Sequence, residues 1–184
     1  MRSRAERPYQ VRRATGDDAA GVARVLEAIV AERVYSAIVA AWPVDEQQAY
    51  MRGLSAREAF HVAETPEGDI VGYQSVERYS TILISMAHVA QLGTFVVPDW
   101  RGRGVGRALF DVTLRFAGAA AYRKLVIQVR ASNAPALTFY RQMGFSECGR
   151  LARQVVVDDR EDDEVIMERW LDSPSESAPP ALES

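Results

Sequence analysis

The chain has 184 residues, of which 48% are hydrophobic and 26% are charged. This length suits one domain, and this composition is that of a globular protein, which excludes collagen, coiled coils and wholly disordered chains. The net charge is only −3, so charge gives no support to nucleic-acid binding. No apolar stretch reaches the roughly 18 residues that a membrane span needs, and we expect no membrane partner.

The N-terminal residues and the few cysteines and histidines bear on compartment and metal binding. Residues 1–7 are mostly charged and lack the hydrophobic stretch of a secretory signal, which predicts a cytoplasmic protein. The single cysteine, Cys148, cannot form an internal disulfide, and no His-Asp pair is evident that would make it a nucleophile. With only His61 and His88 as histidines, we expect no metal site.

The predicted elements begin with a strand over 9–14 and a helix after it. Thr15 and Asp18 have the spacing of a capping box, and apolar residues at helical spacing continue the helix to about Val34. Pro43 interrupts this pattern. Alternating or helically spaced apolar residues predict the remaining elements: a helix over 45–54, strands over 59–64, 70–79 and 87–97, a helix from 105 to about 116, a strand over 125–131, a helix over 133–143, and strands over 145–157 and 165–171.

This order of elements predicts the fold class. The three consecutive strands are expected to form an antiparallel meander, and the strands after them alternate with helices. We therefore expect a mixed, mostly antiparallel α/β sheet of about six to seven strands with helices on both faces. Residues 1–171 are predicted to form one domain, and residues 172–184, which are rich in proline and serine, a disordered tail.

A glycine-rich turn, Arg-Gly-Arg-Gly-Val-Gly at residues 101–106, joins a predicted strand to a predicted helix. Unpaired backbone N–H groups at such a helix start bind anions such as a pyrophosphate, and Arg101 and Arg103 can add charged hydrogen bonds. The glycine spacing is neither that of a P-loop nor G-x-G-x-x-G. The next strand ends near Arg130 rather than at the acid that would hold a ribose, so NAD is disfavoured.

The glycine-rich turn and the helix over 133–143 together resemble the GNAT superfamily of N-acetyltransferases. Residues 101–106 match its Q/R-x-x-G-x-G/A loop, and a Leu-Gly-Thr-Phe-Val-Val-Pro strand at 92–98 precedes them. About 30 residues later, Asn133, Ala136, Tyr140 and Gly144-Phe145 resemble the N-x-x-A-x-x-x-Y-x-x-x-G-F pattern. The resemblance covers about residues 9–170 and implies a GNAT-like acyl-CoA N-acyltransferase fold.

The resemblance also implies a cofactor and its contacts. Acetyl-CoA would donate the acetyl group, with its pyrophosphate held by backbone amides of residues 102–107. Val96 and Val97 would offer backbone groups to the pantetheine arm, and Asn133 would touch its end. The implied cofactor-binding residues are Phe95, Val96, Val97, Arg101, Gly102, Arg103, Gly104, Val105, Gly106, Arg107, Asn133, Ala136 and Tyr140.

Tyr140 is implied as the general acid that protonates the departing thiolate, although an aromatic residue on a helix can also simply pack against the sheet. Family members often carry a glutamate base on the strand before the loop, whereas this sequence has Gln91 and Gly93 there. His88 and, through a water relay, Glu77 are weak candidates for the base. Glu32 is weaker still, and a water wire without a single base is an alternative.

The family's acceptor side lies between its first helices and last hairpin. Tyr35, Trp42 and Tyr50 are candidates to line it, or to belong to the core. Residues 158–164 hold six acids and one base, and could attract a cationic amine, but are more typical of a solvated turn. We expect acetyl transfer to a primary amine of a small molecule by direct attack. The alternatives are a protein N-terminal acetyltransferase and an acyl-CoA sensor without turnover, and a homodimer stays open.

Overall fold

Seven strands of the computed structural model, which describes residues 8–171, lie side by side in one sheet. Their order is β1-β2-β3-β4-β5-β7-β6. Neighbouring strands are antiparallel except β4 and β5, which run parallel. The strands are β1 (Gln10–Arg13), β2 (Ala59–Glu64), β3 (Ile70–Arg78), β4 (Val89–Val96), β5 (Lys124–Arg130), β6 (Ser146–Val157) and β7 (Arg160–Trp170).

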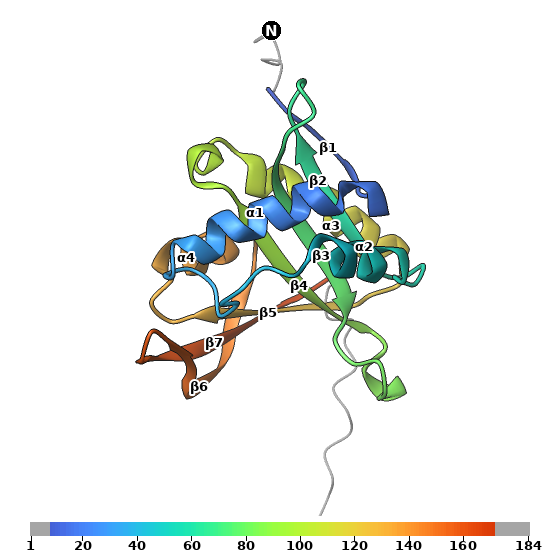
Figure 1. Cartoon of the computed structure of the whole chain (residues 1–184). Helices are drawn as coiled ribbons and strands as arrows, with labels where there is room; N and C mark the ends of the chain where they lie inside the picture. The colour runs from blue at the N-terminus through green and yellow to red at the C-terminus, as the bar shows by residue number, and fades with distance from the viewer. Residues whose placement is uncertain (1–7, 172–184) are drawn as a thin grey trace, which may run out of the picture.

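Helices cover both faces of this sheet (Figure 1). On one face lie α1 (Ala19–Ala31) and α2 (Val44–Arg52), and on the other lie α3 (Val105–Ala119) and α4 (Ala134–Gln142). Each pair buries an apolar stripe, because residues three and four positions apart share one side of a helix. The predicted mixed sheet, the antiparallel meander of β2, β3 and β4, and the two helical layers are confirmed.

The first helix begins at the predicted capping box. The Thr15 hydroxyl accepts a hydrogen bond from the Asp17 N–H at 3.3 Å, and Asp18 accepts one from the Thr15 N–H at 2.8 Å. Arg12 also pairs with Asp18, at 2.7 Å, and with Glu64, at 2.8 Å. The Arg12 hydrogen bond holds the pKa of Asp18 below its usual range. The cap formed by Thr15 and Asp18 and the ion pair of Arg12 with Asp18 therefore stabilise the same helix start.

Several predicted boundaries differ from the structure, and two of these differences bear on the site. The first helix ends at Ala31 rather than near Val34, because Arg33 adopts a positive φ of 58°, which stops the helix. Strand β7 begins at Arg160 rather than at 165. Only Asp158 and Asp159 form the hairpin turn, with φ of 51° and 59°, as a tight two-residue turn requires. The acidic residues 161–164 consequently lie on a paired strand.

The parallel strands β4 and β5 part after a short pairing. Residues 89–91 of β4 pair with residues 124–126 of β5. Beyond that point β4 runs on to Val96 and β5 to Arg130 without pairing to each other. Since β4 still pairs with β3 on its other side up to Val96, the sheet is open along one edge of β4.

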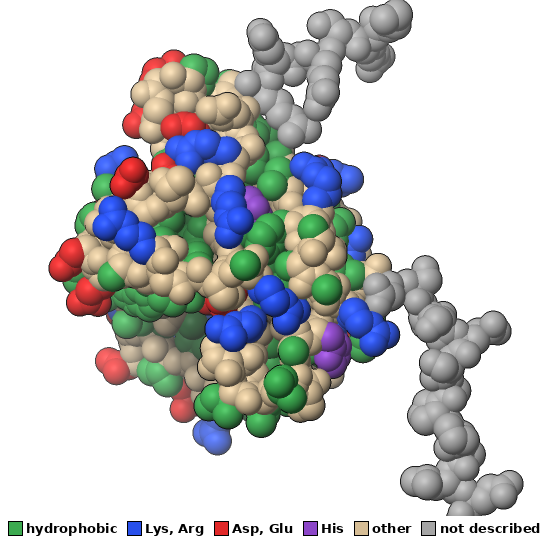
Figure 2. Space-filling model, turned by 90° about the vertical axis from the view of Figure 1, so that its right-hand side faces the viewer, with side chains coloured by type: hydrophobic (Ala, Val, Ile, Leu, Met, Phe, Trp, Pro, Cys, Tyr) green, Lys and Arg blue, Asp and Glu red, His purple; other side chains and the backbone are tan. Residues whose placement is uncertain are grey.

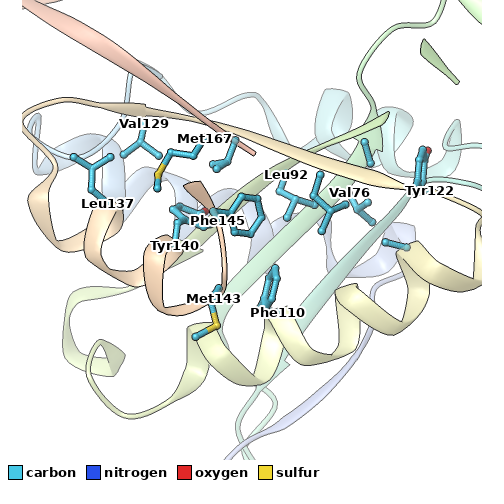
Figure 3. Close-up of a cluster of buried hydrophobic side chains, with 14 of the residues drawn as sticks. Val76, Leu92, Phe110, Tyr122, Val129, Leu137, Tyr140, Met143, Phe145 and Met167 are labelled. Carbon is cyan, nitrogen blue, oxygen red and sulfur yellow. The ribbon is translucent and has the colours of Figure 1, made fainter. Parts of the chain in front are cut away.

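Buried apolar side chains from α3, α4 and the strands form the largest core cluster (Figure 3). Phe110 of α3 is 2% exposed, and its ring meets that of Phe145 edge to face at 5.8 Å. Figure 3 places Tyr140 between Leu137 and Phe145 in this cluster. Helix α4 and the first half of β4 are therefore held together by this core cluster.

Charged side chains are spread over the outside. Figure 2, which shows the side that lies to the right in Figure 1, has lysine and arginine atoms scattered among hydrophobic and uncharged ones. Within residues 8–171, none of the helices combines the length and the apolar character that crossing a membrane would demand. The predicted tail at 172–184 lies outside the described residues.

Replacing Phe110 by alanine should destabilise the protein by about 3–5 kcal/mol, because the change empties a buried site that cannot fully collapse. Chemical denaturation measures this free energy of unfolding. Ile82 is 88% exposed, so Ile82→Ala serves as the control and should change stability by less than about 0.5 kcal/mol. Equal effects of the two substitutions would contradict the assigned core.

Candidate functional site

Two cavities meet where β4 and β5 part. One has a volume of about 490 Å³ and lies against the glycine-rich turn. The other, of about 330 Å³, lies between the sheet and residues 35–38. The residues that line both cavities mark their junction: Tyr35, Thr94, Phe95, Asn133, Ala136 and Tyr140. A molecule bound in one cavity can therefore react with a molecule in the other.

The glycine-rich turn forms the floor of the larger cavity. Gly102 and Gly104 adopt left-handed φ values of 70° and 82°, which favour glycine. Gly104 is the N-cap of α3, and no side chain caps the helix there. The first N–H groups of α3 therefore point toward the cavity without a capping partner, and the helix dipole adds positive potential. The predicted turn between strand and helix has the geometry of an anion cradle.

The two arginines of the turn have protein partners. Arg101 donates to the Val96 carbonyl at 2.9 Å and pairs with Glu32 at 2.8 Å. Its guanidinium also lies over the Tyr35 ring, 4.8 Å from the centroid. Arg103 lies over the Trp100 ring at 5.4 Å. The cradle is thus built from backbone groups, and the charge of Arg101 is already paired with a carboxylate.

Most of the residues implied as cofactor contacts line the larger cavity: Phe95, Val96, Arg101, Gly102, Gly104, Val105, Gly106, Arg107, Asn133, Ala136 and Tyr140. Arg103 and Val97 do not line it. The Val97 N–H instead donates to the Val71 carbonyl at 3.1 Å, and its side chain packs in the core. The sequence analysis missed Pro135 and Phe139, which also line this cavity. They lie four residues apart on α4, so helical periodicity would have placed them on one side of the helix.

Tyr140 stands at the junction of the cavities. Its side chain is 4% exposed and packs edge to face against Phe139 and Phe145. Its hydroxyl donates to the Thr94 hydroxyl at 2.8 Å, and Gln74 donates to the same oxygen at 2.6 Å. Burial raises the pKa of Tyr140 to about 12. The phenol therefore keeps its proton near neutral pH. The sequence analysis did not identify Thr94 as its partner.

A polar strip crosses the floor of the smaller cavity, formed by Glu77 of β3, Gln91 of β4, Gln128 of β5 and Glu164 of β7. Gln91 donates to Gln128 at 3.4 Å, and Gln128 donates to Glu164 at 3.2 Å. Glu77 is the register partner of Gln91 in the neighbouring strand. Carboxylates therefore stand at both ends of the strip, with two amides between them.

The two carboxylates have different surroundings. Glu77 accepts a hydrogen bond from the Tyr50 hydroxyl at 2.6 Å. Burial, and then this hydrogen bond, raises the pKa of Tyr50. Burial raises the pKa of Glu164, because a half-buried carboxylate loses hydration. Both groups can accept further hydrogen bonds from a ligand, since a carboxylate has about four acceptor sites.

The roof of the smaller cavity, residues 33–38, is tied to distant elements. Arg130 donates to the carbonyls of Arg33 and Ser36, each at 3.3 Å, and Asn133 donates to the Tyr35 carbonyl at 3.0 Å. Arg33 pairs with Asp158 in the β6–β7 turn. Strand β5, the start of α4 and the last hairpin together hold this loop over the site.

The comparisons with known proteins agree with this architecture. Residues 56–147, half of the chain, match the family model described as an acetyltransferase (GNAT) domain. The chain belongs to the GNAT family. Its predicted resemblance to GNAT proteins, made from the motifs at 101–106 and 133–145, is thereby confirmed.

Two of the curated relatives that this chain matches are named as acetyltransferases. N-alpha-acetyltransferase RimI of Mycobacterium tuberculosis is 33% identical over 59% of this chain and 63% of its own length. A putative phosphinothricin acetyltransferase, YwnH of Bacillus subtilis, is 24% identical over 84% of this chain and 94% of its own. The four curated relatives with 32–35% identity are matched over only 28–63% of their own length.

The fold agrees with that of a solved structure titled as yncA, a putative acetyltransferase from Salmonella typhimurium with its cofactor acetyl-CoA. The TM-score is 0.82, with 21% identity, and the match covers 94% of this chain and 98% of that one. At this identity the likeness shows the fold, and the GNAT-like fold expected from the sequence is confirmed.

Both histidines of this GNAT domain, His88 as a candidate for the base and His61 without a predicted role, lie away from the cavities. His88 precedes β4, and its ring stacks with that of Trp170 at 6.5 Å. It stands six residues before Thr94 along the strand, roughly 20 Å away. His61 is buried with Nδ1 2.8 Å from the Thr113 hydroxyl, and burial lowers its pKa to about 4. Of the candidates for the base, only Glu77 lines a cavity.

Only one of the aromatic acceptor-side candidates of the GNAT domain lines a cavity. Tyr35 lines both cavities. Tyr50 reaches the site only through Glu77, and Trp42 packs edge to face on Tyr50 at 5.3 Å. Cys148 is exposed and lines neither cavity. Of the acceptor-side candidates Tyr35, Trp42 and Tyr50, only Tyr35 lines both cavities.

The acidic segment at 158–164 of this GNAT domain begins as the solvated turn expected from the sequence, with residues 158–161 exposed, and continues as a partly buried stretch of β7. Asp162 accepts from Arg130 at 2.9 Å and from the Ser132 hydroxyl at 2.5 Å. Asp158 pairs with Arg33. Glu164 is the member of the segment that lines the smaller cavity. Pairing of β7 with β5 aims these side chains at the site.

Asn133 of the GNAT domain both caps α4 and holds the roof, and two substitutions separate these roles. The side chain accepts from the Ala136 N–H at 3.1 Å and donates to the Tyr35 carbonyl. Asn133→Asp should keep the cap but lose the donor, whereas Asn133→Ala should lose both. Amide hydrogen exchange in residues 33–38 should therefore be faster in both variants. Exchange in α4 should be faster only in Asn133→Ala, where the lost cap lowers the free energy of protection by about 1 kcal/mol. Unchanged exchange in the roof would contradict the assigned contact.

Proposed function

We propose that this protein transfers an acetyl group from acetyl-CoA to a primary amine of a small molecule. The observation that carries the proposal is the junction of two cavities at Tyr140. The larger has an anion cradle at the start of α3, and the smaller has carboxylates that attract an ammonium group. Each cavity suits one partner of such a reaction.

The residues of the larger cavity fit acetyl-CoA. The uncapped N–H groups of α3 beside Gly102 and Gly104 suit a pyrophosphate. The edge of β4 beyond Gln91, which has no strand partner on the β5 side, offers backbone groups to the amides of a pantetheine arm. The solved structure with acetyl-CoA supports this assignment through its shared fold.

Acetyl-CoA supplies a thioester, whose carbon–sulfur bond breaks as a bond forms between the acetyl carbon and the amine nitrogen. Tyr140 holds a proton at its hydroxyl for the departing sulfur, because its raised pKa keeps the phenol neutral. Thr94 can donate to the oxygen of Tyr140 after that proton has left. Glu77 takes the proton that the amine must lose, directly or through water, since it lines the acceptor cavity.

The roof favours a small acceptor over a protein N-terminus. Residues 35–38 lie over the smaller cavity, and three neighbouring elements tie the loop in place. The names of the relatives divide between N-alpha-acetyltransferase and phosphinothricin acetyltransferase. Release of CoA thiol, measured with free amines and with short peptides in parallel, distinguishes these acceptors. Acetyl-CoA binding without CoA release from any amine or peptide would instead indicate a sensor.

Gly104→Val tests the cradle, with Gly68→Val as its matched control. Both glycines have positive φ, 82° and 93°, and Gly68 lies in the β2–β3 turn with open space around it. A valine at either position should cost about 1–2 kcal/mol of stability through backbone strain. Calorimetry should show at least tenfold weaker acetyl-CoA binding for Gly104→Val alone. Equal affinity in the two variants would remove the cradle from the proposal.

Tyr140→Phe tests the proton donor. We expect kcat to fall by about 10²- to 10⁴-fold with little change in acetyl-CoA affinity. The loss should be the same at any pH below about 11, because the phenol stays protonated there. Tyr122→Phe is the control, since that buried hydroxyl donates to the Arg57 carbonyl outside both cavities. Normal turnover by Tyr140→Phe would exclude its role as the acid.

A further inference from the structure

The smaller cavity carries more negative charge than one ammonium group requires. Its lining includes the carboxylates Glu77 and Glu164 and the guanidinium of Arg130. Arg130 is paired with Asp162 at 2.9 Å, so its charge is already balanced. Neither Glu77 nor Glu164 forms an ion pair with another residue in the range 8–171. Two unbalanced carboxylates therefore face this cavity.

These carboxylates stand far apart. They lie on β3 and β7, and β4 and β5 run between them. Three strand spacings of about 4.8 Å, roughly 14 Å in all, separate the backbones of β3 and β7 where β4 and β5 are still paired between them. Glu164 lies four residues further along β7 than the residue level with Glu77, beyond the point where β4 and β5 part, so the backbones at Glu77 and Glu164 are further apart than this. One ammonium group cannot contact both ends, because charged hydrogen bonds are about 2.7–2.9 Å long. The cavity thus offers two separate sites for positive charge.

The space between the two ends suits methylene groups. Ala37 and Ile38 of the roof and Phe95 of β4 line the same cavity. The amides of Gln91 and Gln128 are engaged with each other and with Glu164. An extended apolar chain can lie there without leaving these polar groups unpaired. Chemistry of this kind recognises a diamine better than a single amine.

Resting on the proposed function, we propose that the acceptor carries two cationic nitrogens joined by a flexible apolar chain. The nitrogen that reacts lies toward Tyr140 and gives its proton to Glu77. The second nitrogen stays charged and is held by Glu164 at the other end of the polar strip. Glu164 is thereby a specificity residue, and it binds the acceptor without taking part in the transfer.

Three ligands with six carbons each test this inference by direct binding. They are 1,6-diaminohexane, 1-aminohexane and 6-aminohexanoate, whose far ends are an ammonium group, an uncharged methyl group and a carboxylate. Calorimetric titration into the free protein should show the diamine binding at least tenfold more tightly than the monoamine. The anionic ligand should bind most weakly, because its far end meets an unbalanced carboxylate.

Glu164→Gln should remove most of this preference, because the far ammonium group of the diamine loses its charged partner. Glu67→Gln is the matched control, since it removes the same charge from the exposed β2–β3 turn. It should leave all three affinities unchanged. The inference fails if diamine and monoamine bind equally, if neither binds, or if the two variants lose the preference alike.

Turnover separates this inference from the proposed function. Equal rates of acetylation of 1-aminohexane and the diamine would overturn the diamine acceptor and leave the acetyltransferase standing. A diamine preference in binding, without acetyl-CoA binding, would support the cavity's specificity and overturn the proposed function.

Discussion

The parting of β4 and β5 is the constraint on which the rest of the site depends. Their ladder stops at Gln91 and Val126, although both strands continue. A continuous parallel sheet would have used the backbone groups of β4 and closed the space that the cavities occupy. Two elements stabilise this opening. The buried residues of α4 pack on one side of it, and the loop at 33–38 covers the other. Two molecules can therefore approach the opening from opposite sides.

Burial decides what the polar groups at this opening can do. Tyr140 keeps its proton because its ring lies among apolar side chains, and its oxygen meets only the Thr94 hydroxyl among the described residues. Glu164, in contrast, is a half-buried carboxylate without a cationic partner in that part of the chain, so a ligand that brings positive charge is favoured there. The opening thus has a protonated phenol, Tyr140, in one cavity wall and a carboxylate, Glu164, that favours a cationic ligand in the other.

The sequence predicted the features that depend on neighbouring residues. The capping box at Thr15, the glycine-rich turn and the position of Tyr140 on a helix follow from local spacing, and so does the order of elements. Thr94 and Gln128 were not singled out, and Glu164 was noted only as one acid of the segment 158–164. The role of Thr94 arises when α4 packs on β4, and that of Gln128 and Glu164 when β5 pairs with β7. The loop at 33–38 is likewise tied to Asp158, 125 residues away from Arg33. Such contacts have no signature in local patterns.

The central claim is that the cradle and the open edge of β4 form an acetyl-CoA site. Thermal unfolding with acetyl-CoA, ATP or NAD tests it most directly, because a ligand that binds only the folded protein raises the midpoint by mass action. The account predicts a rise with acetyl-CoA that grows with its concentration, and little or none with ATP and NAD. An unchanged midpoint with acetyl-CoA, or an equal rise with ATP, would contradict it.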